Sequence, residues 1–68
     1  MPNLNMRSER IRSGLSLEQA AHLIGVHPNS LQRWELNKAE PLAKYVVLLA
    51  SIYHCSVEYL MGLTSNRN

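Results

Sequence analysis

The residues best suited to chemistry in this 68-residue sequence are hydrogen-bonding side chains between positions 28 and 33. Pro28 can open a helix, because the first helical position needs no backbone N–H donor. On such a helix Leu31 and Trp34 face inward. The residues left outward carry two amides, a hydroxyl and a guanidinium: Asn29, Ser30, Gln32 and Arg33. These groups form hydrogen bonds without making a catalytic set, so the chemistry they predict is binding.

Catalytic and metal-binding chemistry has little support in the sequence. It contains no aspartate and no nucleophile elbow, which excludes a Ser/His/Asp hydrolase. His22 and His27 lie five residues apart and His54 adjoins Cys55, which is not the spacing of known zinc sites. A single cysteine forms no intramolecular disulfide. We therefore predict no enzyme activity, no metal and no cofactor.

Length and composition predict one small domain over residues 1–68. Hydrophobic residues make up 46% and charged residues 18%, a globular balance rather than a disordered one. The net charge of +2 permits an anionic partner without proving one. No stretch approaches the ~18 apolar residues that span a bilayer, and the start lacks the basic and apolar regions of a signal peptide. We expect a cytoplasmic protein with no membrane partner.

Glycine, proline and capping residues divide the chain into five short helical segments. The first is predicted over residues 4–13, with Ile11 inward and Gly14 closing it. Ser16 and Gln19 have the spacing of a capping box at the start of the second helix. Apolar residues then recur at helical spacing: Leu17, Ala20, Ala21 and Ile24.

The second half of the chain continues this pattern after the third helix and a loop at 37–41. The fourth helix has an apolar stripe closed by His54: Leu42, Val46, Leu49, Ala50 and Tyr53. It also carries a second stripe: Tyr45, Leu48 and Ile52. Ser56 caps the last helix and Gly62 ends it. We expect the tail over residues 64–68 to be frayed.

Two short helices separated by Gly25 and Val26 have the spacing of a helix-turn-helix. Such a turn holds the helices at a steep angle, so the second can lie in a DNA major groove while the first crosses the backbone. Residues 16–35, S-L-E-Q-A-A-H-L-I-G-V-H-P-N-S-L-Q-R-W-E, resemble the motif of the Xre and lambdoid-phage repressor and Cro family. The resemblance continues through R-I-R-x-x-L before the motif and A-S-I-Y-H-C-S-V-E-Y-L-M-G after it. It implies an all-α, compact, five-helix lambda-repressor-like DNA-binding domain with a helix-turn-helix core at 16–35.

The resemblance also implies roles for single residues, in three sets. Structural supports match at Ala21, Gly25, Val26, Leu31, Trp34 and Glu35. Base contacts match at Pro28, Asn29 and Arg33, with Gln32 adjacent. Phosphate contacts are expected from Ser16, Leu17, Glu18, His27, Ser30, Asn37, Lys38 and Arg10. Arg10 and Glu35 also match positions that often form an ion pair in this family, which would make Arg10 structural.

The function implied is a transcriptional regulator, by default a repressor that binds an inverted-repeat operator as a homodimer. A restriction–modification controller or an antitoxin has the same fold and stays open. A protein-interaction module is the other alternative, because Leu17 stands where many relatives have a backbone-contacting glutamine and the charge is modest. Leu36, Leu42 and the second stripe on the fourth helix would then be the binding surface, or the homodimer surface.

Overall fold

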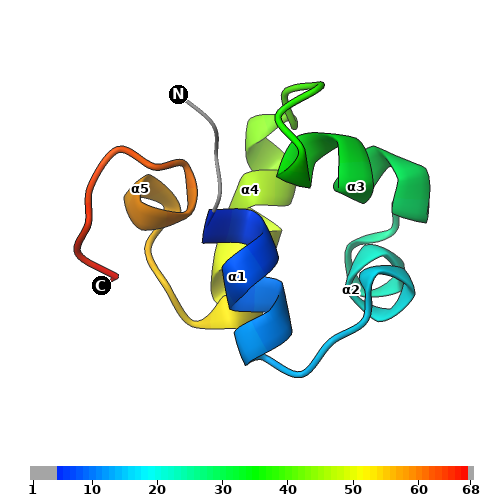
Figure 1. Ribbon diagram of the computed structural model, residues 1–68, viewed down its shortest axis with the longest axis horizontal. Helices are drawn as coiled ribbons and strands as arrows, with labels where there is room; N and C mark the ends of the chain where they lie inside the picture. The colour runs from blue at the N-terminus through cyan, green and yellow to red at the C-terminus, as the bar shows by residue number, and fades with distance from the viewer. Residues whose placement is uncertain (1–4, 68) are drawn as a thin grey trace.

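Five short α-helices make up the part of the chain that the computed structural model describes, residues 5–67 (Figure 1). They are α1 (Asn5–Arg12), α2 (Leu17–Ile24), α3 (Pro28–Glu35), α4 (Ala43–Tyr53) and α5 (Val57–Leu60). No strand occurs within those residues. The prediction of an all-α, five-helix fold is confirmed. Leu4, which we placed in the first helix, lies outside the described residues.

Local sequence determines the ends of most helices. The Ser16 hydroxyl accepts a hydrogen bond from the Gln19 N–H at 3.0 Å, and Gln19 Oε1 accepts one from the Ser16 N–H at 2.8 Å, which completes the predicted capping box. Gly25 ends α2 with a φ of 77°, a left-handed conformation that glycine adopts without steric cost. His54 ends α4 in the same region, with a φ of 57°. These predicted helix ends are confirmed.

The helices pack around one hydrophobic core. In Figure 1, α1 lies in front of α4, with α2 and α3 on one side and α5 on the other. The core residues come from every helix: Met6, Ala20, Ala21, Ile24, Leu31, Trp34, Val46, Leu49, Ala50, Tyr53 and Leu60. Because α3 packs against both α1 and α2, its position depends on the rest of the fold.

Two residues that helical spacing assigned to apolar stripes lie at the surface. Ile11 is 52% exposed, because α1 turns Met6 and Glu9 inward instead. Leu42 is the N-cap residue of α4 rather than a member of its first turn, and it is 64% exposed. Each error came from assigning an apolar residue to the nearest helical stripe.

The second stripe on α4, for which packing within the chain and binding of a partner were both open, is only partly exposed. The Tyr45 ring stacks on Trp34, with a centroid distance of 5.5 Å and an interplanar angle of 27°. Ile52 is half-buried and packs against the core. Leu48 is the member of this stripe that is exposed. Of the second stripe, Leu48 therefore remains part of the exposed surface of α4.

Candidate nucleic-acid interface

The turn between α2 and α3 holds the two helices in a fixed relation. The Val26 N–H donates to the Ala21 carbonyl at 3.0 Å, and Ala21 is fully buried next to it. At the start of α3, His27 Nδ1 accepts a hydrogen bond from the Asn29 N–H at 3.1 Å. Pro28 then occupies the first turn of α3, as predicted. This cap uses one ring nitrogen of His27 and leaves the other, Nε2, to form a different hydrogen bond.

Two buried side chains support α3 from beneath. Leu31 is fully buried, and Trp34 lies in the core with its ring stacked on Tyr45 of α4. An aromatic pair of this kind contributes about 0.5–1.5 kcal/mol beyond the burial of its area. The placement of Trp34 and Leu31 leaves the opposite side of α3 facing solvent.

An ion pair fastens α3 to α1. Arg10 donates to Glu35 from Nε at 2.8 Å and from Nη2 at 3.1 Å, and its Nη1 donates to the Leu15 carbonyl at 3.1 Å. The side chains of Arg10 and Glu35 are only 12% and 3% exposed. Hydrogen bonding to Glu35 raises the pKa of Arg10, which keeps this guanidinium charged. Three N–H donors of Arg10 are engaged within the fold, which supports the structural role, and a contact of Arg10 to phosphate stays a prediction.

The solvent-facing side of α3 consists of hydrogen-bonding groups. Asn29, Gln32 and Arg33 are exposed, while Pro28 and Ser30 are partly exposed. Figure 1 shows α3 at the edge of the molecule, with no segment of the chain lying outside it. The residues predicted to contact base edges therefore share one accessible helix.

The candidate phosphate-contacting residues lie at helix ends. Exposed ones occupy the start of α2 and both ends of α3: Ser16, Glu18, His27, Asn37 and Lys38. Leu17 is partly buried against the core, so its backbone amide rather than its side chain is available there. The Ser16 hydroxyl is already used in the capping box. A helix N-terminus attracts anions through such amides.

Sequence reasoning missed a second buried ion pair. Arg67 donates to Glu9 from Nε at 3.1 Å and from Nη2 at 2.9 Å, and Nη2 also donates to the Tyr53 carbonyl at 2.9 Å. The Glu9 side chain is 3% exposed. The Ser56 N–H donates to the Arg67 carbonyl at 2.8 Å. The tail that we expected to be frayed is therefore held against α1 through residue 67, and Asn68 lies outside the described residues.

No local signal could have revealed this pair. Glu9 stands between Ser8 and Arg10 in a polar stretch, and its partner is 58 positions away. The family resemblance implied an ion pair for Glu35 and gave no partner for Glu9. The hydrogen bonds from Arg67 lower the pKa of Glu9 despite its burial, which keeps this carboxylate charged.

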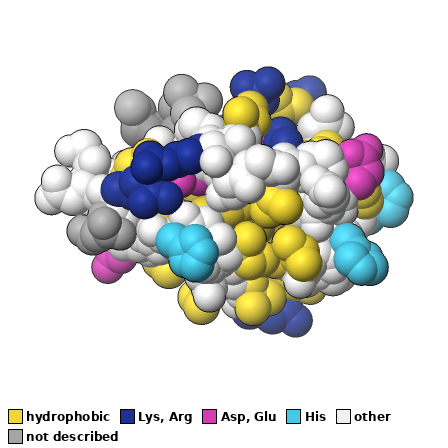
Figure 2. Space-filling view, turned by 90° about the horizontal axis from the view of Figure 1, so that it is seen from below, with side chains coloured by type: hydrophobic (Ala, Val, Ile, Leu, Met, Phe, Trp, Pro, Cys, Tyr) yellow, Lys and Arg dark blue, Asp and Glu magenta, His cyan; other side chains and the backbone are white. Residues whose placement is uncertain are grey.

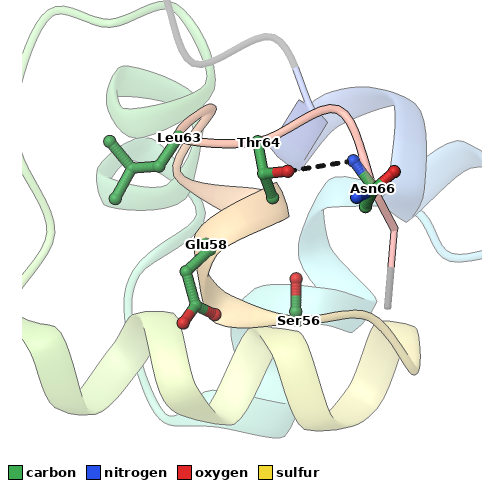
Figure 3. A pocket seen from close by; sticks show the side chains of 5 residues that line it. All are labelled: Ser56, Glu58, Leu63, Thr64 and Asn66. Carbon is green, nitrogen blue, oxygen red and sulfur yellow. Dashed lines mark hydrogen bonds between the residues drawn. The ribbon is translucent and has the colours of Figure 1, made fainter.

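Two surface hollows lie within the residues that the structure describes. One, of about 340 Å³, lies between α5 and the tail and is lined by Ser56, Glu58, Leu63, Thr64 and Asn66 (Figure 3). Glu58 is the one charged residue of that lining. Over residues 5–67 no group of three or more His, Cys, Asp and Glu side chains could hold a metal ion. None of the helices over the same residues is long and apolar enough to cross a membrane.

Comparison with known proteins identifies the same motif. A helix-turn-helix family model matches residues 6–60, which include the turn and all of α2 and α3. The chain is also similar to YobD, an uncharacterized HTH-type transcriptional regulator of Bacillus subtilis (strain 168), with 34% identity over 61 residues. That match covers 90% of this chain and 54% of YobD, so the chain spans about half the length of this curated relative. From the capped turn, the buried supports of α3 and the family match, the chain belongs to the Xre/Cro-type helix-turn-helix family.

Proposed function

We propose that this chain is a sequence-specific transcriptional repressor that binds an inverted-repeat operator as a dimer, with α3 in the major groove. The observation that carries the proposal is the division of α3 into two sides. Leu31, Trp34 and Glu35 anchor one side to the core, and the other presents amide and guanidinium groups to solvent. A major groove admits such a helix and distinguishes base pairs by their hydrogen-bonding pattern.

Specificity is assigned to the exposed side of α3. The Arg33 guanidinium suits guanine O6 and N7, and the Asn29 amide suits adenine N6 and N7, each pairing being worth about 1–3 kcal/mol of discrimination. Gln32 lies beside them, and Pro28 offers apolar contact to a thymine methyl. Contacts to phosphate come from the ends of α2 and α3 and fix the register without reading sequence: Ser16, Leu17, Glu18, His27, Ser30, Asn37 and Lys38.

The experiment that tests the proposal is selection of bound duplexes from a random library at two salt concentrations. We expect an inverted repeat with half-sites about 10 bp apart, centre to centre. Recovery without sequence preference at low salt, disappearing at high salt, would show charge attraction alone and would contradict the proposal. The size of the salt effect also reports how many phosphates the chain contacts.

A protein-interaction module is the second candidate, and two exposed leucines favour it. Leu36 and Leu42 flank the loop between α3 and α4, and each is more than half exposed. An antitoxin or a restriction–modification controller would use such a surface together with DNA binding. Gene neighbourhood distinguishes these roles, and failure of the duplex selection would favour the module that binds protein only.

A further inference from the structure

Helix α4 is apolar around nearly its whole circumference. Its sequence, A-K-Y-V-V-L-L-A-S-I-Y, contains one charged residue, Lys44. The inner side is buried in the core, yet the outer side also carries large apolar residues, with Val47 54% and Leu48 44% exposed. We call the exposed outer residues the α4 face: Ala43, Lys44, Val47, Leu48 and Ser51. A helix that is apolar all round is normally buried, so this face lacks a cover.

Apolar surface extends beyond the helix itself. A groove of about 280 Å³ shares Ala43 and Val47 with the α4 face and is lined further by Pro41, Val46, Val57 and Met61. None of these lining residues is charged. Figure 2 shows, on the face seen from the side of the α1–α2 loop, hydrophobic side chains gathered near the middle, with Lys and Arg side chains toward the edges. A nucleic acid needs several cations at its binding surface, so the α4 face suits protein instead.

We propose that a second copy of this chain covers the α4 face, with the two α4 helices packed antiparallel about a two-fold axis between Val47 and Leu48. The proposal rests on the dimer of the proposed function and names its surface. An isologous interface must be complementary to itself. Along the face the order is Lys44, then Val47 and Leu48, then Ser51, which reads the same in both directions as polar, apolar, polar. Rotation about the axis therefore packs apolar residues together at the centre.

Charge decides between the antiparallel and the parallel arrangement. In the antiparallel pair, Lys44 lies opposite the partner's Ser51, beside the C-terminal turn of that helix, where the partial negative charge of the helix favours a cation. In a parallel pair the two Lys44 side chains would meet. The Lys44 ammonium lies 5.0 Å from the centroid of the Tyr45 ring, and Val47 and Leu48 stay exposed beside it.

The first test is the mass of the chain in solution, measured by sedimentation over a concentration series. The Leu48→Glu variant puts a charge at the centre of the proposed interface, and we expect its dimer Kd to rise at least about tenfold. Leu23→Glu is the matched control, because Leu23 is 58% exposed on α2 and is not a member of the α4 face. Far-UV circular dichroism of both variants checks that the monomer stays folded. A chain that is monomeric at every concentration, or a folded Leu48→Glu dimer, would overturn the proposal.

The second test separates the two orientations. Ser51→Glu places a carboxylate opposite the partner's Lys44 in the antiparallel pair, and we expect the dimer Kd to fall about two- to five-fold. Ser51→Lys at the same position should raise it by a similar factor. In a parallel pair both variants place like charges together, so weaker association of Ser51→Glu would contradict the antiparallel arrangement.

Failure of this interface can be told apart from failure of DNA recognition. The folded Leu48→Glu monomer keeps α3 intact, and we expect it to retain base preference on a duplex with a single half-site while losing the advantage of the inverted repeat. A wild-type dimer that shows no base preference would support the α4 face and contradict the proposed function. Base preference in a wild-type chain that stays monomeric would support base reading by α3 and contradict the α4 interface.

Discussion

Each side of α1 is held by an ion pair, yet the exposed surface on one side is polar and on the other side apolar. Arg10 of α1 pairs with Glu35 of α3, and the adjacent Glu9 pairs with Arg67 of the tail. Beyond the first pair, α3 presents amides and a guanidinium. Beside α5, α4 presents Val47, and the next residue, Leu48, is exposed as well. The polarity of the exposed side, rather than the fold, distinguishes a surface suited to DNA from one suited to protein.

Sequence distance explains why only one of the two pairs was predictable. Arg10 and Glu35 both lie inside the stretch that resembles the family, whereas Arg67 follows it. The first pair positions the helix assigned to DNA, and the second closes the chain around α5. Variants that weaken each side separately should therefore have different effects.

Removing the main support of α3 should have the largest effect. We expect Trp34→Ala to lower the free energy of unfolding by about 3–5 kcal/mol, because it leaves a cavity and removes the stacking on Tyr45. That is most of the stability of a domain of this size. Urea denaturation measures the change, with Leu23→Ala on the exposed side of α2 as the control. A Trp34→Ala variant with nearly unchanged stability would show that α3 is held by other contacts.

Breaking the ion pair between α1 and α3 should come next. Arg10→Ala leaves the buried Glu35 carboxylate without its charged partner, and we expect a loss of about 3 kcal/mol in the free energy of unfolding. Arg7→Ala, at an exposed position of the same helix, controls for the loss of one positive charge. Equal stability of the two variants would mean that water replaces Arg10 at no cost.

The ion pair between Glu9 and Arg67 should make the free energy of unfolding depend on pH. The hydrogen bonds from Arg67 hold the pKa of Glu9 below its ordinary 4.5 in the folded state. This pair therefore stabilises the fold above that pH, and its contribution is lost as the pH falls through the lowered pKa. Arg67→Ala should be less stable than the wild type at pH 7. It should also lose less stability when the pH is lowered below the lowered pKa of Glu9, measured by urea denaturation at pH 7 and at an acidic pH. Parallel pH profiles would contradict the assignment.

A single phosphate contact should have the smallest effect. Lys38 is exposed directly after α3, and we expect Lys38→Ala to weaken binding to all duplexes alike and to reduce the salt slope by about one. Titration of a selected operator and an unrelated duplex at several salt concentrations measures both quantities. A loss confined to the operator would assign Lys38 to base reading instead.

Much of the fold could be predicted because its signals are local. The capping box at Ser16 and Gln19, the left-handed Gly25 and the first-turn Pro28 each depend on residues within a few positions. Burial was harder to predict. Ile11 and Leu42 were assigned to apolar stripes by spacing alone, and the buried Glu9 finds its partner, Arg67, at the far end of the chain.

The candidate site likewise contains residues whose placement follows from local sequence and residues whose placement required the structure. The exposed position of Asn29, Gln32 and Arg33 follows from the helical period set by Leu31 and Trp34, so sequence suffices to predict it. The engagement of Arg10 within the fold required the distances to Glu35 and Leu15. The stacking of Tyr45 on Trp34, which removed it from the expected second stripe, depends on how α3 and α4 cross.

The most direct test of DNA reading by α3 is a comparison of the wild type and Arg33→Ala on an operator panel carrying every single base-pair substitution. The assignment predicts that Arg33→Ala loses discrimination at one base pair of each half-site, by about 1–3 kcal/mol, and keeps its preferences elsewhere. A uniform loss on every duplex, like that expected of Lys38→Ala, would contradict the assignment of base reading to the exposed side of α3.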